Sequence, residues 1–176
     1  MKKTIKFVLT LVCLVAVALS ALCSCESTPA NEEVENGTVW EFSGVGEIEV
    51  INKNKSDSFV NSHAATVKSY YYTVYDFSNP KTKSDAIGFK DGKVFYIGYQ
   101  GVGSPSFANG VNIYGSCEPY QNDFGTYSGS DINIVDVNEE IVDAYIRDGV
   151  LTLVHEDSTL RMELLFTKTN SISIAE

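Results

Sequence analysis

The apolar positions of this chain lie in short runs of strand-forming residues that are separated by turns. Between residues 37 and 168, Tyr, Phe, Val, Ile and Thr dominate, and turn-forming pairs recur at short intervals. This pattern is typical of an all-β protein. No stretch repeats apolar residues convincingly at the i, i+3, i+4 spacing of an amphipathic helix. The pattern therefore predicts one all-β domain over residues 37–168, without a clear helix.

Nine predicted strands follow one another as a meander. Gly44 and Gly46 interrupt the long first strand, and glycines inside a strand suit a sharp bend at a barrel corner. We therefore expect a single antiparallel meander barrel of about 8–9 strands. The predicted strands are residues 39–51, 66–77, 86–90, 93–99, 110–117, a stretch within 126–137, 141–147, 150–155 and 159–168.

Two dipeptides predict tight hairpins between neighbouring strands. Asp91-Gly92 and Asp148-Gly149 suit two-residue type I′ turns, in which both central residues need positive φ. The second turn pairs Ile146 with Leu151. A similar turn at Asp157-Ser158 would pair Leu151 with Leu164 and Leu153 with Met162. One apolar face results from both turns, which supports the two hairpins because a slip of one residue would invert it.

The middle of the chain leaves two alternatives open. Residues 87–99 are apolar on both faces, so either a second layer covers these strands or their outer face is exposed. The predicted loops 52–65 and 100–109 are long enough to have a function, and we expect them to surround one end of the barrel.

The N-terminus has the pattern of a secretory leader. Three lysines precede an apolar run over residues 7–19, which is too short to span a bilayer comfortably, and small residues follow. An uncleaved membrane anchor is the alternative. Leu22-Cys23-Ser24-Cys25 resembles a bacterial lipobox, which implies cleavage after residue 24 and diacylation of Cys25. More than one acyl chain holds a protein stably on a membrane.

This interpretation divides the chain into four parts: a signal peptide (1–24), an acidic flexible tether (25–36), the barrel domain (37–168) and a C-terminal tail (169–176). Loss of a leader that carries three lysines and no acid would change the net charge from −10 to −13. We therefore expect no binding to nucleic acid.

Cys117 would lack a partner, so no internal disulfide is expected. We expect a bacterial cell-envelope protein, anchored in the outer membrane.

Three segments have a pattern in common with a known family: Gly37-Thr-Val-Trp40, Gly125-Thr-Tyr127 before 131–134, and 149–153 followed by 160–168. With these segments in a small meander barrel behind a lipobox, the chain resembles the lipocalin-like bacterial lipoproteins. Lipocalins open with Gly-x-Trp, and here one extra residue separates Gly37 from Trp40. The helix that follows a lipocalin barrel is not predicted. The resemblance implies the fold more strongly than a function.

No catalytic motif is apparent, so we expect neither an enzyme nor a metal or cofactor site. Ser128 and Ser130 have the wrong spacing for a nucleophile elbow, and the acidic residues of 131–143 lack EF-hand spacing. The ten tyrosines are the most suggestive feature, because Tyr combines a rigid apolar ring with a hydrogen-bonding hydroxyl. The candidate ligand or mouth residues are Trp40, Tyr96, Tyr99, Tyr114 and His155.

Binding, rather than catalysis, is the predicted function. A small apolar or amphipathic ligand would occupy a hollow barrel that Trp40 closes at one end, and His155 would lie at a barrel rim. A second possible function is that of a surface-exposed scaffold that binds no ligand. An alternative from another functional class is an interaction or inhibitor protein that recognises a basic macromolecule through its acidic surface.

Overall fold

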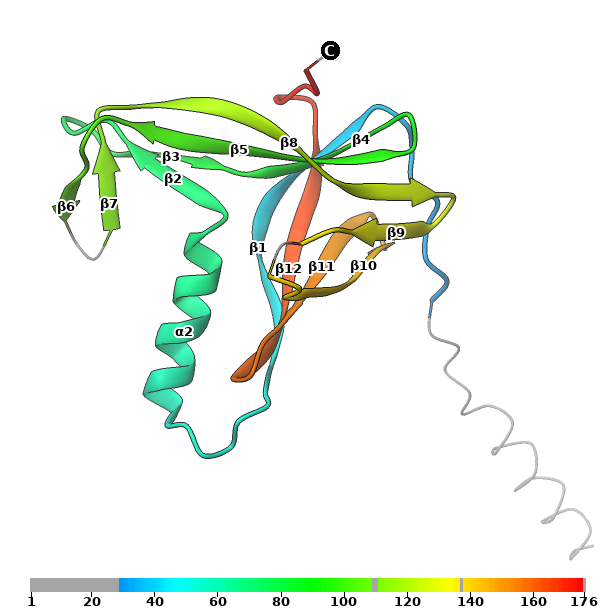
Figure 1. Ribbon diagram of the computed structural model, residues 1–176, viewed down its shortest axis with the longest axis horizontal. Coiled ribbons are helices and arrows are strands. Elements are labelled where there is room, and N and C mark those ends of the chain that lie inside the picture. Colours follow the sequence, from blue (N-terminus) through cyan, green and yellow to red (C-terminus); the bar gives the residue numbers. More distant parts are fainter. Residues whose placement is uncertain (1–28, 109–110, 137, 176) are drawn as a thin grey trace, which may run out of the picture. The chain divides into compact units, whose positions relative to one another are not determined.

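The computed structural model describes residues 29–108, 111–136 and 138–175 (Figure 1). Asn31–Glu176 forms one compact unit, which contains every strand and the helix of the described part. The predicted leader and Cys25 lie outside the described residues. Within the described part, no helix is long and apolar enough to cross a membrane.

Eight strands form one antiparallel sheet in the order β10-β11-β12-β1-β4-β5-β8-β9. Apart from β9 and β10, barrel strands that follow one another along the chain are hydrogen-bonded neighbours in the sheet, and the last strand, β12, pairs with the first, β1. The end strands β9 and β10 lie beside each other, so the sheet nearly closes on itself. The predicted all-β meander barrel is confirmed. The strands are β1 (Thr38–Val50), β4 (Ala86–Lys90), β5 (Lys93–Val102), β8 (Ser116–Ser128), β9 (Asp131–Ile134), β10 (Ile141–Arg147), β11 (Val150–Glu156) and β12 (Leu160–Thr169).

Two insertions in the meander build a second, four-stranded sheet. The order is β3-β2-β7-β6, with β2 and β7 parallel, and the pair β2–β3 comes from a different insertion than β6–β7. The predicted strands 66–77 and 110–117 were therefore wrong as barrel strands, because their residues are divided among several elements. The strands of this sheet are β2 (Tyr72–Tyr75), β3 (Lys81–Ser84), β6 (Ser106–Ala108) and β7 (Val111–Tyr114).

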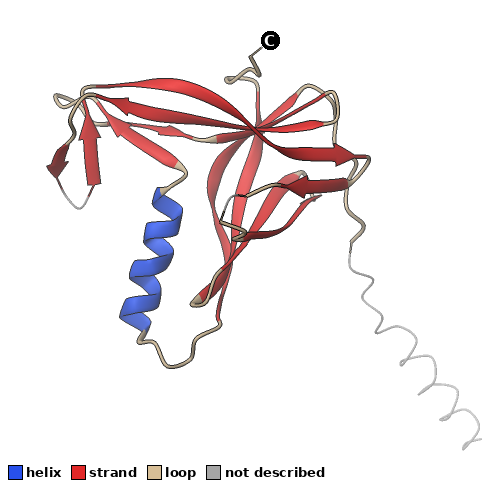
Figure 2. Cartoon of the chain, viewed as in Figure 1, coloured by secondary structure: helices blue, strands red, loops and turns tan. Residues whose placement is uncertain are grey.

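The expectation of no clear helix is also wrong, because helix α2 spans Asp57–Ser69 (Figure 2). The Ser56 side chain caps it by accepting a hydrogen bond from the Phe59 N–H. Its buried stripe is Val60, Ala64 and Val67, at i, i+4 and i+7. The stripe is narrow and contains one small residue, so the helical spacing of apolar residues is hard to recognise in the sequence. Packing against the barrel stabilises the helix more than its own residue pattern does.

Both predicted type I′ turns are present. Asp91 and Gly92 have φ values of 52° and 78°, and Asp148 and Gly149 have φ values of 51° and 70°. In the long first strand, register shifts interrupt the pairing of β1 with β12 next to Gly44 and between Val45 and Ile48. The bend expected from the glycines therefore coincides with β-bulges.

The register of the final hairpin differs from its prediction by two residues. Ile146 pairs with Leu151 as predicted, but Leu151 pairs with Phe166 and Leu153 with Leu164. The reason is the turn: the Asp157 N–H donates to the Leu160 carbonyl, so four residues rather than two connect the paired strands. A shift of two preserves the face of every side chain, which is why the predicted core face is still correct.

Large side chains fill the body of the barrel. Trp40 and Phe42 of β1 point inward and join the main core cluster. The barrel is therefore not hollow along its length, and any ligand cavity must lie at an end. The largest fully buried side chains are Ile87, Phe89, Val94, Ile146, Leu151, Leu153, Leu160, Met162, Leu164 and Phe166.

The C-terminal tail covers an apolar patch on the outside of the barrel. Ile172 and Ile174 pack against Val39, Ala86 and Ile97, whose side chains form a second small core cluster. This contact explains why residues 87–99 are apolar on both faces: a second layer is present, and the end of the chain contributes to it.

The residues just before β1 also lie against the barrel. The Glu32 N–H donates to the Ile146 carbonyl at 2.8 Å, and the Val34 N–H donates to the Gly129 carbonyl at 2.9 Å. Arg147 Nε donates to Asn31 Oδ1. The second half of the segment expected to be a flexible tether is thus bound to the domain.

Candidate functional site

A cavity of about 530 Å³ opens where the end of α2 meets the inner face of β5 and β8. We call it the mouth cavity. The turn between β9 and β10 and the end of β11 complete its wall. It is lined by Val67, Tyr70, Tyr71, Tyr96, Tyr120, Asn122, Asp123, Phe124, Val135, Asp136, Asn138, Glu140, Ile141 and His155.

Aromatic rings around Tyr96 form one wall of the mouth cavity. The ring of Tyr96 lies 5.5 Å from that of Phe124, 6.1 Å from that of Tyr120 and 6.5 Å from that of Tyr71, measured between centroids. Gly98 makes room for this cluster, since a Cβ there would lie 2.6 Å from the hydroxyl of Tyr120. The rings hold one another in place, so this wall exists before any ligand arrives.

A buried carboxylate is bonded to this aromatic wall. The hydroxyl of Tyr96 donates a hydrogen bond to Oδ2 of Asp85, a residue that is 3% exposed. Its other oxygen, Oδ1, has no hydrogen-bond partner among the residues described. Burial raises the pKa of Asp85 to about 6, although the hydrogen bond from Tyr96 opposes the shift. Burial and the Asp85 charge also raise the pKa of Tyr96, which keeps its hydroxyl protonated as a donor.

Several carboxylates act on the tyrosines of the cavity. Burial raises the pKa of Tyr71, and the negative charges of Asp136, Asp85 and Glu140 raise it further. Burial and the Asp85 charge raise the pKa of Tyr120 in the same way. The electrostatic potential at these tyrosines of the mouth cavity is therefore negative.

His155 lines the cavity but is already hydrogen-bonded. It is buried, with Nε2 3.3 Å from Oδ2 of Asp157 and Nδ1 3.9 Å from Oε2 of Glu140. The same Asp157 oxygen lies 2.5 Å from Nε2 of His63 on α2. Burial by itself would raise the pKa of Asp157, but hydrogen bonds from His63, from two backbone N–H groups and from His155 lower it.

The rim of the cavity is the acidic turn that follows β9. Oδ2 of Asp136 accepts hydrogen bonds from the backbone N–H groups of Glu140 and Ile141, and Oδ1 accepts from that of Asn138. Asp136 therefore binds the backbone of three described residues of the turn, and one of them, Glu140, lines the cavity.

The structure brings two of the five candidate ligand residues together in the mouth cavity, namely Tyr96 and His155. Trp40 is buried in the core with its indole N–H donating to Thr38. The ring of Tyr99 lies under the Lys83 ammonium, and the ring of Tyr114, on the small sheet, packs over Gly101 of β5. None of these three lines the mouth cavity, because they belong to the core or to the outer layer.

The main residues that sequence reasoning missed at this site are Tyr71, Tyr120 and Asp85. The run of tyrosines at 70–72 was a signal, but its assignment to a strand hid the fact that Tyr71 follows a helix. Asp85 lies between β3 and β4, and nothing in its local sequence distinguishes it from an exposed turn residue.

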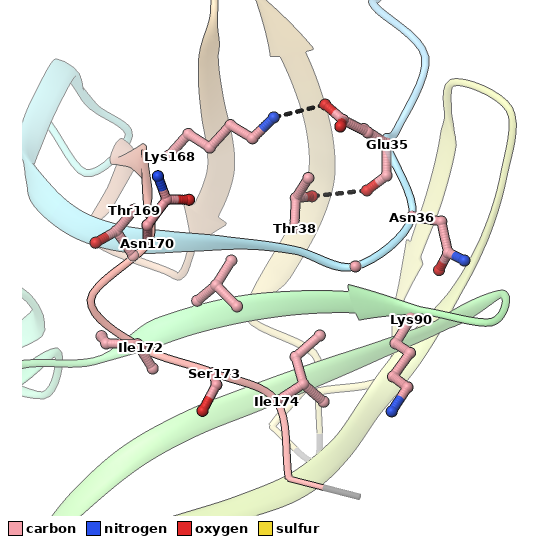
Figure 3. A pocket seen from close by; sticks show the side chains of 12 residues that line it. Glu35, Asn36, Thr38, Lys90, Lys168, Thr169, Asn170, Ile172, Ser173 and Ile174 are labelled. Atoms are coloured by element: carbon pink, nitrogen blue, oxygen red, sulfur yellow. Dashed lines mark hydrogen bonds and ion pairs between the residues drawn. The ribbon is translucent and has the colours of Figure 1, made fainter.

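Further cavities lie outside the barrel, and two of them exceed about 300 Å³. One, of about 490 Å³, lies between the start of β1 and the C-terminal tail, where Lys168 Nζ donates to Glu35 Oε2 at 2.5 Å (Figure 3). The other, of about 350 Å³, lies on the small sheet beside the exposed Phe107. The mouth cavity differs from both in having side chains of the barrel interior in its wall.

Among the residues that the structure describes, no group of three or more His, Cys, Asp or Glu side chains is placed to hold a metal ion. Searches against protein-family models, curated proteins and solved structures found no match to this chain.

Proposed function

We propose that this chain is a ligand-binding lipoprotein of the bacterial cell envelope, anchored through acyl chains on Cys25, which binds a small amphipathic molecule in the mouth cavity. The observation that carries the proposal is the mouth cavity itself, a preformed concavity with an aromatic wall at one end of a filled barrel. Its volume of about 530 Å³ lies within the range of about 300–1,000 Å³ that is common for small-molecule sites.

The lining suits a molecule with one apolar and one polar part. Tyr71, Tyr96 and Phe124 offer ring surface, and this surface contributes most of the favourable burial on binding. Asn122 and Glu140 supply polar groups on the same cavity, and such groups orient a ligand. Because the rings already contact one another, little side-chain entropy opposes binding.

Native mass spectrometry of residues 26–176, purified from the protein's own host, tests ligand binding. This form retains the whole compact unit. We expect an adduct of small-molecule mass that disappears on denaturation. Gly98→Ala would push Tyr120 out of the wall and reduce the adduct, whereas Val102→Ala, on the exposed end of the same strand, would leave it unchanged.

The opposite result is equally informative. An apo mass under gentle conditions, with no adduct in the wild type, would contradict the ligand proposal. The acidic surface would then favour recognition of a basic macromolecule, and pull-downs at low salt would be the next experiment.

Membrane anchoring is tested separately by metabolic labelling with an alkyne-bearing palmitate. We expect label on the wild type and on Cys23→Ser, and no label on Cys25→Ser. Cys23 is a matched control because it lies two residues upstream in the same leader. Equal labelling of the two variants would contradict acylation at Cys25.

A further inference from the structure

The charged residues of the mouth cavity are strongly biased in sign. Asp123, Asp136 and Glu140 line it, and no lysine or arginine is among its described lining residues. Asp123 is mostly exposed and lies 3.7 Å from the Lys93 ammonium, so its charge is partly compensated. Asp136 and Glu140 lie together on the rim turn, close to the aromatic rings.

A buried carboxylate adds to this bias from behind the wall. Asp85 is nine-tenths or more buried, and its Oδ1 has no partner among the described residues. The hydroxyl of Tyr96 binds its other oxygen, and the ring of Tyr96 lines the cavity. A buried carboxylate with one unpartnered oxygen is costly. A positive charge placed against Tyr96 would offset part of that cost.

The carboxylates of two segments act on one tyrosine of the cavity. Asp85 lies between β3 and β4, whereas Asp136 and Glu140 share the rim turn. In addition to burial, the charge of each raises the pKa of Tyr71. The hydroxyl of Tyr71 therefore reports a negative potential that arises from both the inner wall and the rim. The same potential would attract a cation and repel an anion.

The aromatic wall selects a particular kind of cation. The faces of aromatic rings carry partial negative charge and bind ammonium groups, most strongly where water is excluded. Tyr71, Tyr96, Tyr120 and Phe124 supply such rings around the negative region. A hard metal ion would instead need several oxygen ligands at close range, and the described residues form no such group.

His155 is the one basic side chain in the described lining. Its two ring nitrogens face Asp157 at 3.3 Å and Glu140 at 3.9 Å. Any charge on this imidazole would therefore be directed toward carboxylates, and His155 is not placed as a free partner for an anionic ligand.

We propose that the mouth cavity binds an organic cation, an ammonium group carried on an apolar body, with the ammonium against the rings of Tyr71 and Tyr96 and the carboxylate of Glu140. This inference rests on the proposed ligand-binding function and names the chemical class of the ligand. Aromatic rings contact the apolar body, and the rim carboxylates compensate the charge.

The test compares two probes of the same shape and different charge, phenyltrimethylammonium and tert-butylbenzene. Both are titrated into residues 26–176, and binding is followed by NMR. We expect the dissociation constant of the cation to be at least about tenfold lower than that of its neutral counterpart. Equal affinities would overturn the inference and leave the ligand-binding proposal intact.

Two neighbouring glutamates provide a matched pair of variants. Glu140 lines the cavity and Glu139, beside it on the same turn, does not. Glu140→Gln is expected to weaken phenyltrimethylammonium binding about twofold to fivefold, as for a partly exposed ion pair, without changing tert-butylbenzene binding. Glu139→Gln should change neither. Equal weakening by both variants would show that only net charge matters and would overturn the inference.

A further variant tests the rings. Tyr96→Leu, checked for folding by the fluorescence of the single Trp40, should lose most of the preference for the cation. If neither probe binds the folded wild type, the inference is overturned, and the native mass spectrum decides the ligand-binding proposal independently.

Discussion

Nε2 of His63 lies 2.5 Å from Oδ2 of Asp157, and this contact connects helix α2 to the turn between β11 and β12. The two residues are 94 positions apart in the sequence. Asp157 also accepts hydrogen bonds from the backbone N–H groups of Thr159 and Leu160, and His155 lies beside it. One carboxylate thus holds the turn, the helix and a residue of the mouth cavity in place.

Replacement of Asp157 by Asn should destabilise the protein at neutral pH by about 1–3 kcal/mol, because hydrogen bonds to a charged acceptor are lost or weakened. The pKa of Asp157 is lowered in the folded state. The contribution of Asp157 to the free energy of unfolding is therefore complete above the unfolded pKa of about 4 and declines as the pH falls below that value. Urea unfolding of wild type and Asp157→Asn at pH 7 and at pH 3.5 measures the difference in stability between them. A difference that is larger at pH 3.5 than at pH 7 would contradict this role of the Asp157 carboxylate.

The pH dependence at Asp85 should have the opposite sign. Its pKa is raised to about 6 when folded, so ionisation destabilises the folded state increasingly as the pH rises from about 4 to 6. Relative to wild type, Asp85→Asn should become more stable by about 2–3 kcal/mol between pH 4 and pH 7. Urea unfolding across this range tests the slope. Asp91→Asn, on an exposed turn that tolerates Asn, is the control and should show no such trend.

The core should be most sensitive where the barrel meets the helix layer. Phe166 is fully buried, and its ring packs edge-on against Phe42 at 5.5 Å and Tyr71 at 5.9 Å. Phe166→Ala should reduce the free energy of unfolding by about 3–5 kcal/mol, through lost burial and the cavity left behind. Phe107→Ala, at a residue that is 74% exposed, should change it by less than about 0.5 kcal/mol. The fluorescence of buried Trp40 follows the unfolding transition of both variants.

The C-terminal tail should contribute to stability although it belongs to no strand. Ile172→Ser combined with Ile174→Ser would uncover Val39, Ala86 and Ile97, and we expect a loss of about 1–3 kcal/mol in chemical denaturation. Ser173→Ala, on the exposed side of the same segment, is the matched control. An unchanged unfolding midpoint in the double variant would show that the tail does not protect the patch.

The sequence alone determined the barrel and much of its pairing. Alternating residues, Asp-Gly turns that need positive φ and a bend at Gly44 are local signals, and strand faces follow from a period of two. These signals fixed the inner face of β10, β11 and β12 even where the turn length was misjudged, because a shift of two residues leaves each side chain on its face.

Only the tertiary structure decided the helix, the second sheet and the mouth cavity. The buried stripe of α2 consists of only three residues along one face of the helix, and contact with the barrel stabilises the helix. The pairing of β2 with β7 joins two insertions that are distant in the sequence. The site depends in the same way on Asp85, Tyr71 and Tyr96 meeting from separate elements. Burial, charge and hydrogen bonding among them arise from packing, which no local pattern of residues encodes.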